Sequence, residues 1–260
     1  MVSTIPNPHV KQKVAERALV VAVTSRSVFD SGADDGGVLG VGVAFPLLQA
    51  LQRVNERLLE DDPAETLLFD VVLITTDAQQ QQQRPPLLSS ARHHGLDVSR
   101  FCFSGEDDFL ESLLTNDVQL FLTTDQRQAQ QASGKGVLSA LMDQQVASSP
   151  SEQLRVMFCG DAVVRSNSDL MGAIRPATQR FLARLGELRR RFGVFHSPLS
   201  IILVTFHGGR DSCGGALRTL RSRGVHVDEV YCLAGAPRGP IMSQLRPHFL
   251  LREGLSGLQE

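Results

Sequence analysis

Residues 154–161 read Leu-Arg-Val-Met-Phe-Cys-Gly-Asp, an apolar run that closes with a thiol, a glycine and a carboxylate. A short apolar run of this kind predicts a buried strand, and the polar residues after it predict a strand-end loop. Residues 199–205, Leu-Ser-Ile-Ile-Leu-Val-Thr, are the most strand-like run of the chain and close with a hydroxyl. These two runs place reactive groups at the carboxyl ends of two predicted strands.

Predicted strands and helices alternate along the rest of the chain. The strands are expected at residues 18–24, 69–75, 100–103, 117–122, 229–233 and 247–251, and the longer helices near residues 46–60, 179–191 and 212–223. This alternation predicts an α/β fold in which helices cover both faces of a parallel sheet. Ligands in such sheets bind beyond the carboxyl ends of the strands. The loops at these ends are residues 25–27, 159–162, 205–209 and 236–239.

Two segments are expected to lie outside the regular elements. Residues 31–42 hold five glycines and two aspartates, a composition that predicts a loop. Residues 79–83 are a glutamine run closed by Pro85 and Pro86, which predicts a polar surface turn or a fraying helix end. Neither segment is expected to carry chemistry.

The composition is that of a globular protein. The chain has 260 residues, of which 42% are hydrophobic and 21% charged, enough to form a core in one large domain or two small ones. A formal net charge of −2 argues against a nucleic-acid partner, which would require a basic excess. The four cysteines include no C-x-x-C pair, which disfavours zinc ribbons, redox dithiols and a disulfide framework.

No targeting or membrane segment is expected from the sequence. Residues 1–10 are polar and lack the apolar stretch of a signal peptide. The longest apolar runs, residues 18–23 and 201–204, are far too short to span a bilayer. We therefore expect a cytoplasmic protein with no membrane partner.

Long collinear stretches of the chain carry a family resemblance. They are residues 23–29, 42–57, 69–75, 100–103, 151–164, 203–205, 216–222 and 233–240. Together they resemble the cytosolic type I 5′-nucleotidases, which are haloacid-dehalogenase-like phosphohydrolases that cleave nucleoside monophosphates, AMP among them. The resemblance implies a parallel, three-layer, Rossmann-type core in residues 148–260 that carries the phosphate site. Residues 1–147 would then form an N-terminal α/β half packed on that core.

The resemblance also implies roles for the residues at the strand ends. The family's nucleophile strand ends in Asp-Gly-Asp, whereas this chain has Cys159, Gly160 and Asp161. Cys159 therefore occupies the nucleophile position and Asp161 the acid/base position. Thr205 matches the hydroxyl that holds the phosphate together with Gly160, and Arg238 stands where the family has a phosphate-binding lysine. The residues expected to line the substrate are Ser25, Arg26 and His207.

The resemblance implies Mg²⁺ as the cofactor, but the implied ligands have changed. The family's late acidic pair aligns with Arg252 and Glu253, so that one member is now a cation. Asp161 and Glu253 are the remaining candidate metal ligands. Because Mg²⁺ prefers hard oxygen ligands and gains little from a thiol, the cysteine at position 159 predicts weak metal binding or its loss.

The expected function is binding of nucleoside 5′-monophosphates with weak hydrolysis, since removing a nucleophile elsewhere costs about 10⁶ in rate. A first alternative is a catalytically inactive nucleotide-binding or regulatory partner, of a second copy or of an active paralogue. A second is a cysteine-dependent phosphatase, because Cys159 and Arg165 have the C-x5-R spacing. Two observations disfavour it: residues 162–164 are Ala-Val-Val rather than glycines, and Asp161 would raise the pKa of the thiol.

Overall fold

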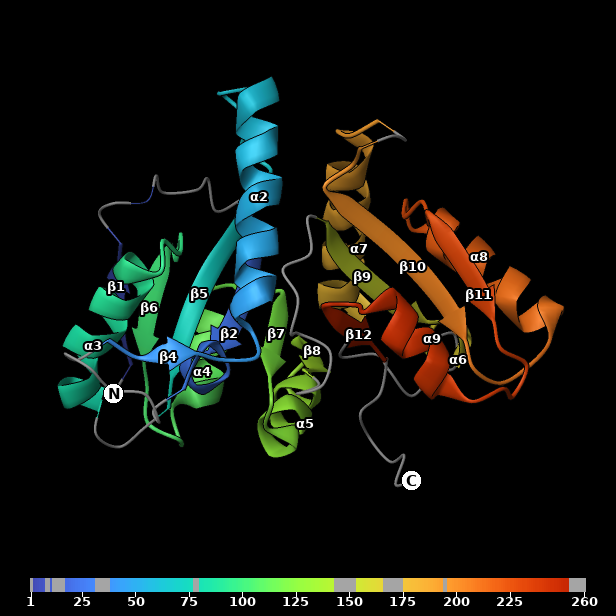
Figure 1. Cartoon of the computed structure of the whole chain (residues 1–260). Helices are drawn as coiled ribbons and strands as arrows, with labels where there is room; N and C mark the ends of the chain where they lie inside the picture. The colour runs from blue at the N-terminus through green and yellow to red at the C-terminus, as the bar shows by residue number, and fades with distance from the viewer. Residues whose placement is uncertain are drawn as a thin grey trace.

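The computed structural model describes residues 2–7, 10, 17–30, 38–76, 80–142, 153–165, 175–193 and 196–252. These residues form two sheets that lie side by side, each accompanied by helices (Figure 1). The first sheet has the strand order β1-β6-β5-β2-β7-β8 and the second has the order β11-β10-β9-β12. This arrangement confirms the predicted α/β fold with largely parallel sheets, and it is consistent with a haloacid-dehalogenase-like three-layer core.

The first sheet is built around β2, whose side chains are all buried. Its strands are β1 (Ser3–Pro6), β2 (Leu19–Thr24), β5 (Phe69–Thr75), β6 (Arg100–Phe103), β7 (Leu120–Thr123) and β8 (Leu138–Leu141). The accompanying helices are α1 (Ser25–Val28), α2 (Phe45–Asp61), α3 (Gln80–His93), α4 (Phe109–Thr115) and α5 (Gln126–Gly134). The paired strands run parallel except β1, which is antiparallel to β6. A separate two-stranded ribbon joins β3 (Phe29–Asp30) to β4 (Gly40–Val41).

The second sheet carries the predicted chemistry. Its strands are β9 (Leu154–Cys159), β10 (Leu199–Thr205), β11 (Glu229–Cys232) and β12 (Phe249–Leu251), and its helices are α6 (Gly160–Arg165), α7 (Arg175–Arg190), α8 (Arg210–Ser222) and α9 (Arg238–Leu245). All three strand pairings are parallel. Cys159 lies opposite Val204, and Phe158 lies opposite Leu251. The register therefore brings the ends of β9, β10 and β12 to one edge.

One hydrophobic core serves both sheets. It includes buried side chains such as Val21 and Leu51 from the first half and Leu185 and Leu203 from the second. Helix α2 shows why: its sequence places several leucines and Val54 on one face, and that face is buried against both halves. The two halves are therefore packed as one body.

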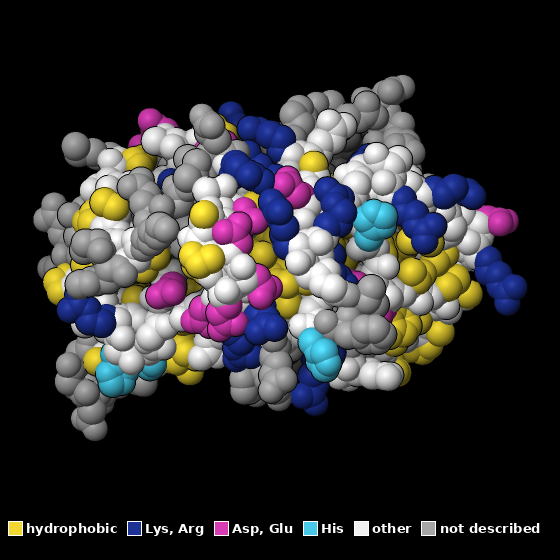
Figure 2. Space-filling view, turned by 90° about the horizontal axis from the view of Figure 1, so that it is seen from above, with side chains coloured by type: hydrophobic (Ala, Val, Ile, Leu, Met, Phe, Trp, Pro, Cys, Tyr) yellow, Lys and Arg dark blue, Asp and Glu magenta, His cyan; other side chains and the backbone are white. Residues whose placement is uncertain are grey.

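Polar contacts reinforce this packing at the edge of the core. Arg17 pairs with Glu187 at 2.7 Å, and Arg191 pairs with Glu65 at 3.0 Å. The Arg184 Nη1 group also donates to the carbonyl oxygen of Ala18, 2.8 Å away. Figure 2 shows the molecule from above, where basic and acidic side chains lie next to one another in the middle of the view.

Several expectations about the elements require correction or cannot be followed. The prolines do not end a helix, because α3 begins within the glutamine run at Gln80 and continues through Pro85 and Pro86 to His93. The buried Leu87 and Ala91 hold this part of the helix against the core although the prolines remove two backbone donors. Strands β1 and β8 were not expected, and neither was the ribbon of β3 and β4, although β4 (Gly40–Val41) lies within the expected loop of residues 31–42. Residues 31–37 and the expected domain boundary between residues 147 and 148 lie outside the described residues. No described helix has the length and apolar character that a membrane crossing requires.

Candidate phosphate site at the strand ends

The carboxylate of Asp161 connects the ends of β9 and β10. Its Oδ2 atom accepts hydrogen bonds from the backbone N–H of Phe206 at 2.8 Å and of His207 at 3.3 Å. The Cys159 Sγ atom lies 3.9 Å from the same oxygen. The structure thus brings the predicted nucleophile and acid/base positions together at the edge of the second sheet.

Gly160 and Thr205 pack against each other beneath this carboxylate. A Cβ atom at position 160 would lie only 2.6 Å from Thr205 Oγ1, so the close approach of the two strand ends requires glycine. The Thr205 side chain is fully buried, and its hydroxyl has no hydrogen-bond partner among the described residues. A buried hydroxyl without a partner is costly, so this group is suited to an oxygen supplied by a ligand.

Two arginines lie at the same edge. The Arg238 guanidinium carbon lies 5.1 Å from the centre of the Phe206 ring. Arg252 directly follows β12, so the register places it beside Cys159. Partial burial and the neighbouring Arg238 lower the pKa of Arg252, whereas the Cys159 thiol acts in the opposite direction. Neither arginine has a carboxylate partner in the part of the chain that the structure describes.

The Cys159 thiol lies in surroundings that keep it protonated. Burial is the largest effect and raises its pKa, and it outweighs the backbone N–H of Ala162, which lowers the pKa. The negative charge of Asp161 raises the pKa further, against the smaller effects of Arg252 and the backbone N–H of Asp161. A neutral, buried thiol is a poor nucleophile. The side chain of Arg165, the second half of the C-x5-R pattern, is outside the described residues.

The residues present do not fit the Mg²⁺ that the resemblance implies. Asp161 is a candidate ligand, but its Oδ2 atom already accepts two backbone N–H groups. The neighbouring positions hold a neutral thiol and the cation of Arg252, neither of which suits a hard divalent ion. Within the described ranges no three metal-binding side chains are grouped, and Glu253 lies outside those ranges.

The three expected substrate-lining residues lie in two places. His207 is exposed and lies at the site, with its Nδ1 atom 4.0 Å from Asp161 Oδ2. Ser25 and Arg26 instead begin α1, after β2 of the first sheet. Ser25 is buried and Arg26 is exposed, and neither lines the cavity described next. The strand pattern could not show that β2 and β9 would belong to different sheets.

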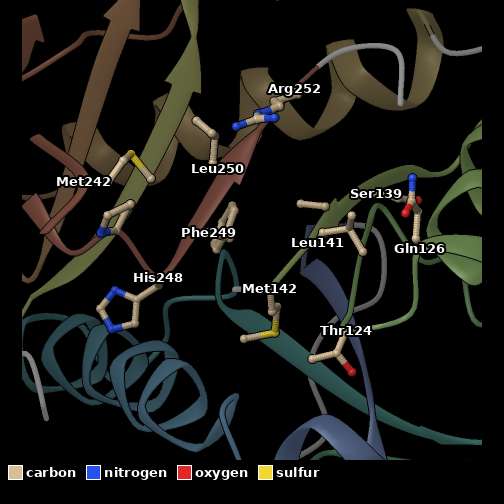
Figure 3. Close-up of a pocket in the computed structure, with 12 residues that line it drawn as sticks. Thr124, Gln126, Ser139, Leu141, Met142, Met242, His248, Phe249, Leu250 and Arg252 are labelled. Atoms are coloured by element: carbon tan, nitrogen blue, oxygen red, sulfur yellow. The ribbon is translucent and has the colours of Figure 1, made fainter. Parts of the chain in front are cut away.

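A cavity of about 380 Å³ lies between the two sheets (Figure 3). Its walls come mainly from β8 and β12, which face each other, and from the amino end of α5. The lining residues are Thr124, Gln126, Ser139, Ala140, Leu141, Met142, Met242, Pro247, His248, Phe249, Leu250 and Arg252. Burial is the main cause that lowers the pKa of His248 to about 4, so this imidazole is neutral near pH 7. Arg252 joins the cavity to the strand-end cluster.

Comparisons with known proteins agree with the resemblance. A family model described as 5′-nucleotidase matches residues 32–171. The human protein named cytosolic 5′-nucleotidase 1B is 35% identical over an alignment of 240 residues, and the match covers 81% of this chain and 38% of that relative. The chain thus spans well under half the length of this curated relative. The family model covers more than half of the chain, and on these grounds the protein belongs to the 5′-nucleotidase family.

Proposed function

We propose that this protein binds nucleoside 5′-monophosphates such as AMP and hydrolyses them only weakly. The observation that carries the proposal is the buried hydroxyl of Thr205, which packs against Gly160 and has no hydrogen-bond partner among the described residues. Arg238 and Arg252 lie at the same edge of the sheet, and within the described ranges neither pairs with a carboxylate. Such a group of donors suits a phosphate. Family membership supports a nucleotide as the ligand, and the printed name of the human relative supports a cytoplasmic location.

The weak hydrolysis follows from the group at position 159. Phosphoryl transfer in this family is expected to use a carboxylate nucleophile there, and this chain offers a buried thiol whose pKa is raised. Asp161 is retained at the acid/base position, but position 159 has no carboxylate that could attack the phosphorus. The same chemistry disfavours a cysteine-dependent phosphatase, which requires a thiolate. Vanadate-sensitive, metal-free phosphate release would favour that phosphatase over the present proposal.

A second candidate function is a catalytically inactive nucleotide-binding partner of a second copy or of an active paralogue. The position of Arg252 favours it, because a cation beside Cys159 disfavours metal binding at this edge. Binding and turnover separate the two functions. Weak hydrolysis predicts slow phosphate release from AMP by the natural protein and none by Asp161→Asn. An inactive binding partner predicts that both proteins bind AMP and that neither releases phosphate.

We expect AMP to stabilise the protein against thermal unfolding. At a hundred times its dissociation constant, a ligand that binds only the folded state contributes about 2.7 kcal/mol. Differential scanning calorimetry with AMP and with adenosine gives the shift, and a phosphate-release assay on the same sample gives the turnover. The absence of any shift with AMP would contradict nucleotide binding. Brisk release by the natural protein would contradict the weak-hydrolysis proposal.

The cavity between the sheets offers room for the nucleoside. Its volume of about 380 Å³ lies within the range of small-molecule pockets, roughly 300–1,000 Å³. Thr124 and Gln126 supply polar groups at its rim, and Met242 and Phe249 supply apolar surface. Arg252 lines the cavity and also lies beside Cys159, so one nucleotide could contact both places.

Gln126→Trp tests this placement of the nucleoside. The indole would fill part of the cavity, and we expect AMP to bind about tenfold more weakly, which corresponds to about 1.4 kcal/mol. Binding of inorganic phosphate should be unchanged, as isothermal titration calorimetry can show. Gln131→Trp is the matched control, because Gln131 is exposed on the same helix and does not line the cavity. Equal AMP binding by the two variants would contradict the placement.

A further inference from the structure

The strand-end site carries more positive charge than its described neighbours balance. Arg238 and Arg252 are close enough for each other's charge to matter, and Asp161 is the carboxylate at the ends of β9 and β10. That carboxylate already accepts backbone N–H groups from the end of β10. Two like charges at one partly buried edge repel each other unless an anion lies between them.

The position of Arg252 is fixed by the sheet rather than by a mobile loop. Strand β12 pairs with β9 residue by residue, from Phe249 opposite Val156 to Leu251 opposite Phe158. The next residue along β12 therefore lies level with Cys159. Arg238 reaches the same edge from the start of α9 and lies over the ring of Phe206, whose N–H group binds Asp161.

We infer that Arg238 and Arg252 together bind the dianionic phosphate of a nucleotide without a metal ion. Arg252 supplies positive charge at the edge where the resemblance implies Mg²⁺, and the planar guanidinium offers paired N–H donors that match phosphate oxygens. The inference deepens the proposed function and rests on it for the identity of the nucleotide. A guanidinium neutralises charge but supplies no water activation, which agrees with a site that binds phosphate better than it cleaves it.

The test is calorimetric titration with inorganic phosphate and with AMP, first in EDTA and then with excess Mg²⁺. We expect the dissociation constants in the two buffers to agree within about twofold. Arg252→Gln and Arg238→Gln should each weaken binding of both ligands tenfold or more, and Arg252→Lys should weaken it less because it keeps the charge. Arg218→Gln is the control, since Arg218 is exposed on α8 away from the site. Circular dichroism checks that every variant is folded.

The outcomes separate the inference from the proposed function. Metal-free binding of phosphate without binding of AMP supports the arginine site and overturns the nucleotide function. Binding of AMP only when Mg²⁺ is present supports the function and overturns the inference. Unchanged binding by Arg252→Gln also overturns it, whereas the absence of binding by either ligand overturns both.

Discussion

The Cys159→Asp variant is expected to release phosphate from AMP, in the presence of Mg²⁺, at least about 100-fold faster than the natural protein. The substitution returns a carboxylate to the end of β9, beside Asp161 and level with Arg252. Removing such a nucleophile from other enzymes costs about 10⁶ in rate, so a partial recovery of that loss is large. Malachite-green detection of released phosphate measures the change.

Two further variants show whether the carboxylate itself causes the faster release of phosphate. Cys159→Ser and Cys159→Asn have similar size but no carboxylate, and we expect no gain from either. Because Arg252 would pair with the introduced carboxylate and make it a weaker nucleophile, adding Arg252→Asp to Cys159→Asp should raise the rate at saturating AMP further, while AMP binds the double variant more weakly. If Cys159→Ser instead abolishes a measurable activity of the natural protein, the thiol is the nucleophile and the weak-hydrolysis proposal is wrong.

Asp228→Ala is expected to lower the free energy of unfolding by about 3 kcal/mol. The carboxylate binds the Arg189 Nε group through both oxygens at 3.0 Å and accepts the backbone N–H of Ile201 at 2.8 Å. Removing it leaves the buried Arg189 without its charge partner. Breaking a buried pair costs roughly 3–5 kcal/mol, and the lower end applies because Asp228 keeps some exposure.

Urea unfolding at equilibrium measures this loss as a lower midpoint with an unchanged slope. Glu60→Ala is the control, because Glu60 and Arg57 form an exposed pair at 3.0 Å on one helix. Pairs of that kind contribute at most about 0.5 kcal/mol. If the two substitutions had equal effects, the Arg189–Asp228 contact would be no stronger than a surface pair.

The central strands of both halves could be predicted because parallel strands buried on both faces are continuous apolar runs. Residues 199–205 coincide with β10, and residues 69–75 coincide with β5. The missed strands lack that signal. β1 is an edge strand that ends in Pro6, and β8 reads Leu-Ser-Ala-Leu with no β-branched residue. Their places depend on partners that are distant in sequence.

The strand-end cluster was also predictable, since Cys159, Gly160 and Asp161 are consecutive and Thr205 ends the next strand of the same sheet. The cavity was not, because its walls come from the edge strands of two sheets and one of these strands was itself missed. Hydrophobic periodicity shows which residues are buried, but it does not show how one sheet lies against another. For the same reason, the sequence did not show that Ser25 and Arg26, which begin α1 after β2, lie outside the lining of this cavity.

The shared hydrophobic core has a consequence for how a ligand reaches the cavity. The side chains that fill the space between the sheets belong to a single apolar cluster, and Arg184 is hydrogen-bonded across it. Separation of the halves would expose side chains of this cluster to water, which costs roughly 25 cal/mol for each Å² of apolar surface. We therefore expect a ligand to enter past side chains that line the cavity, such as Gln126 and Met242, rather than by separation of the two halves.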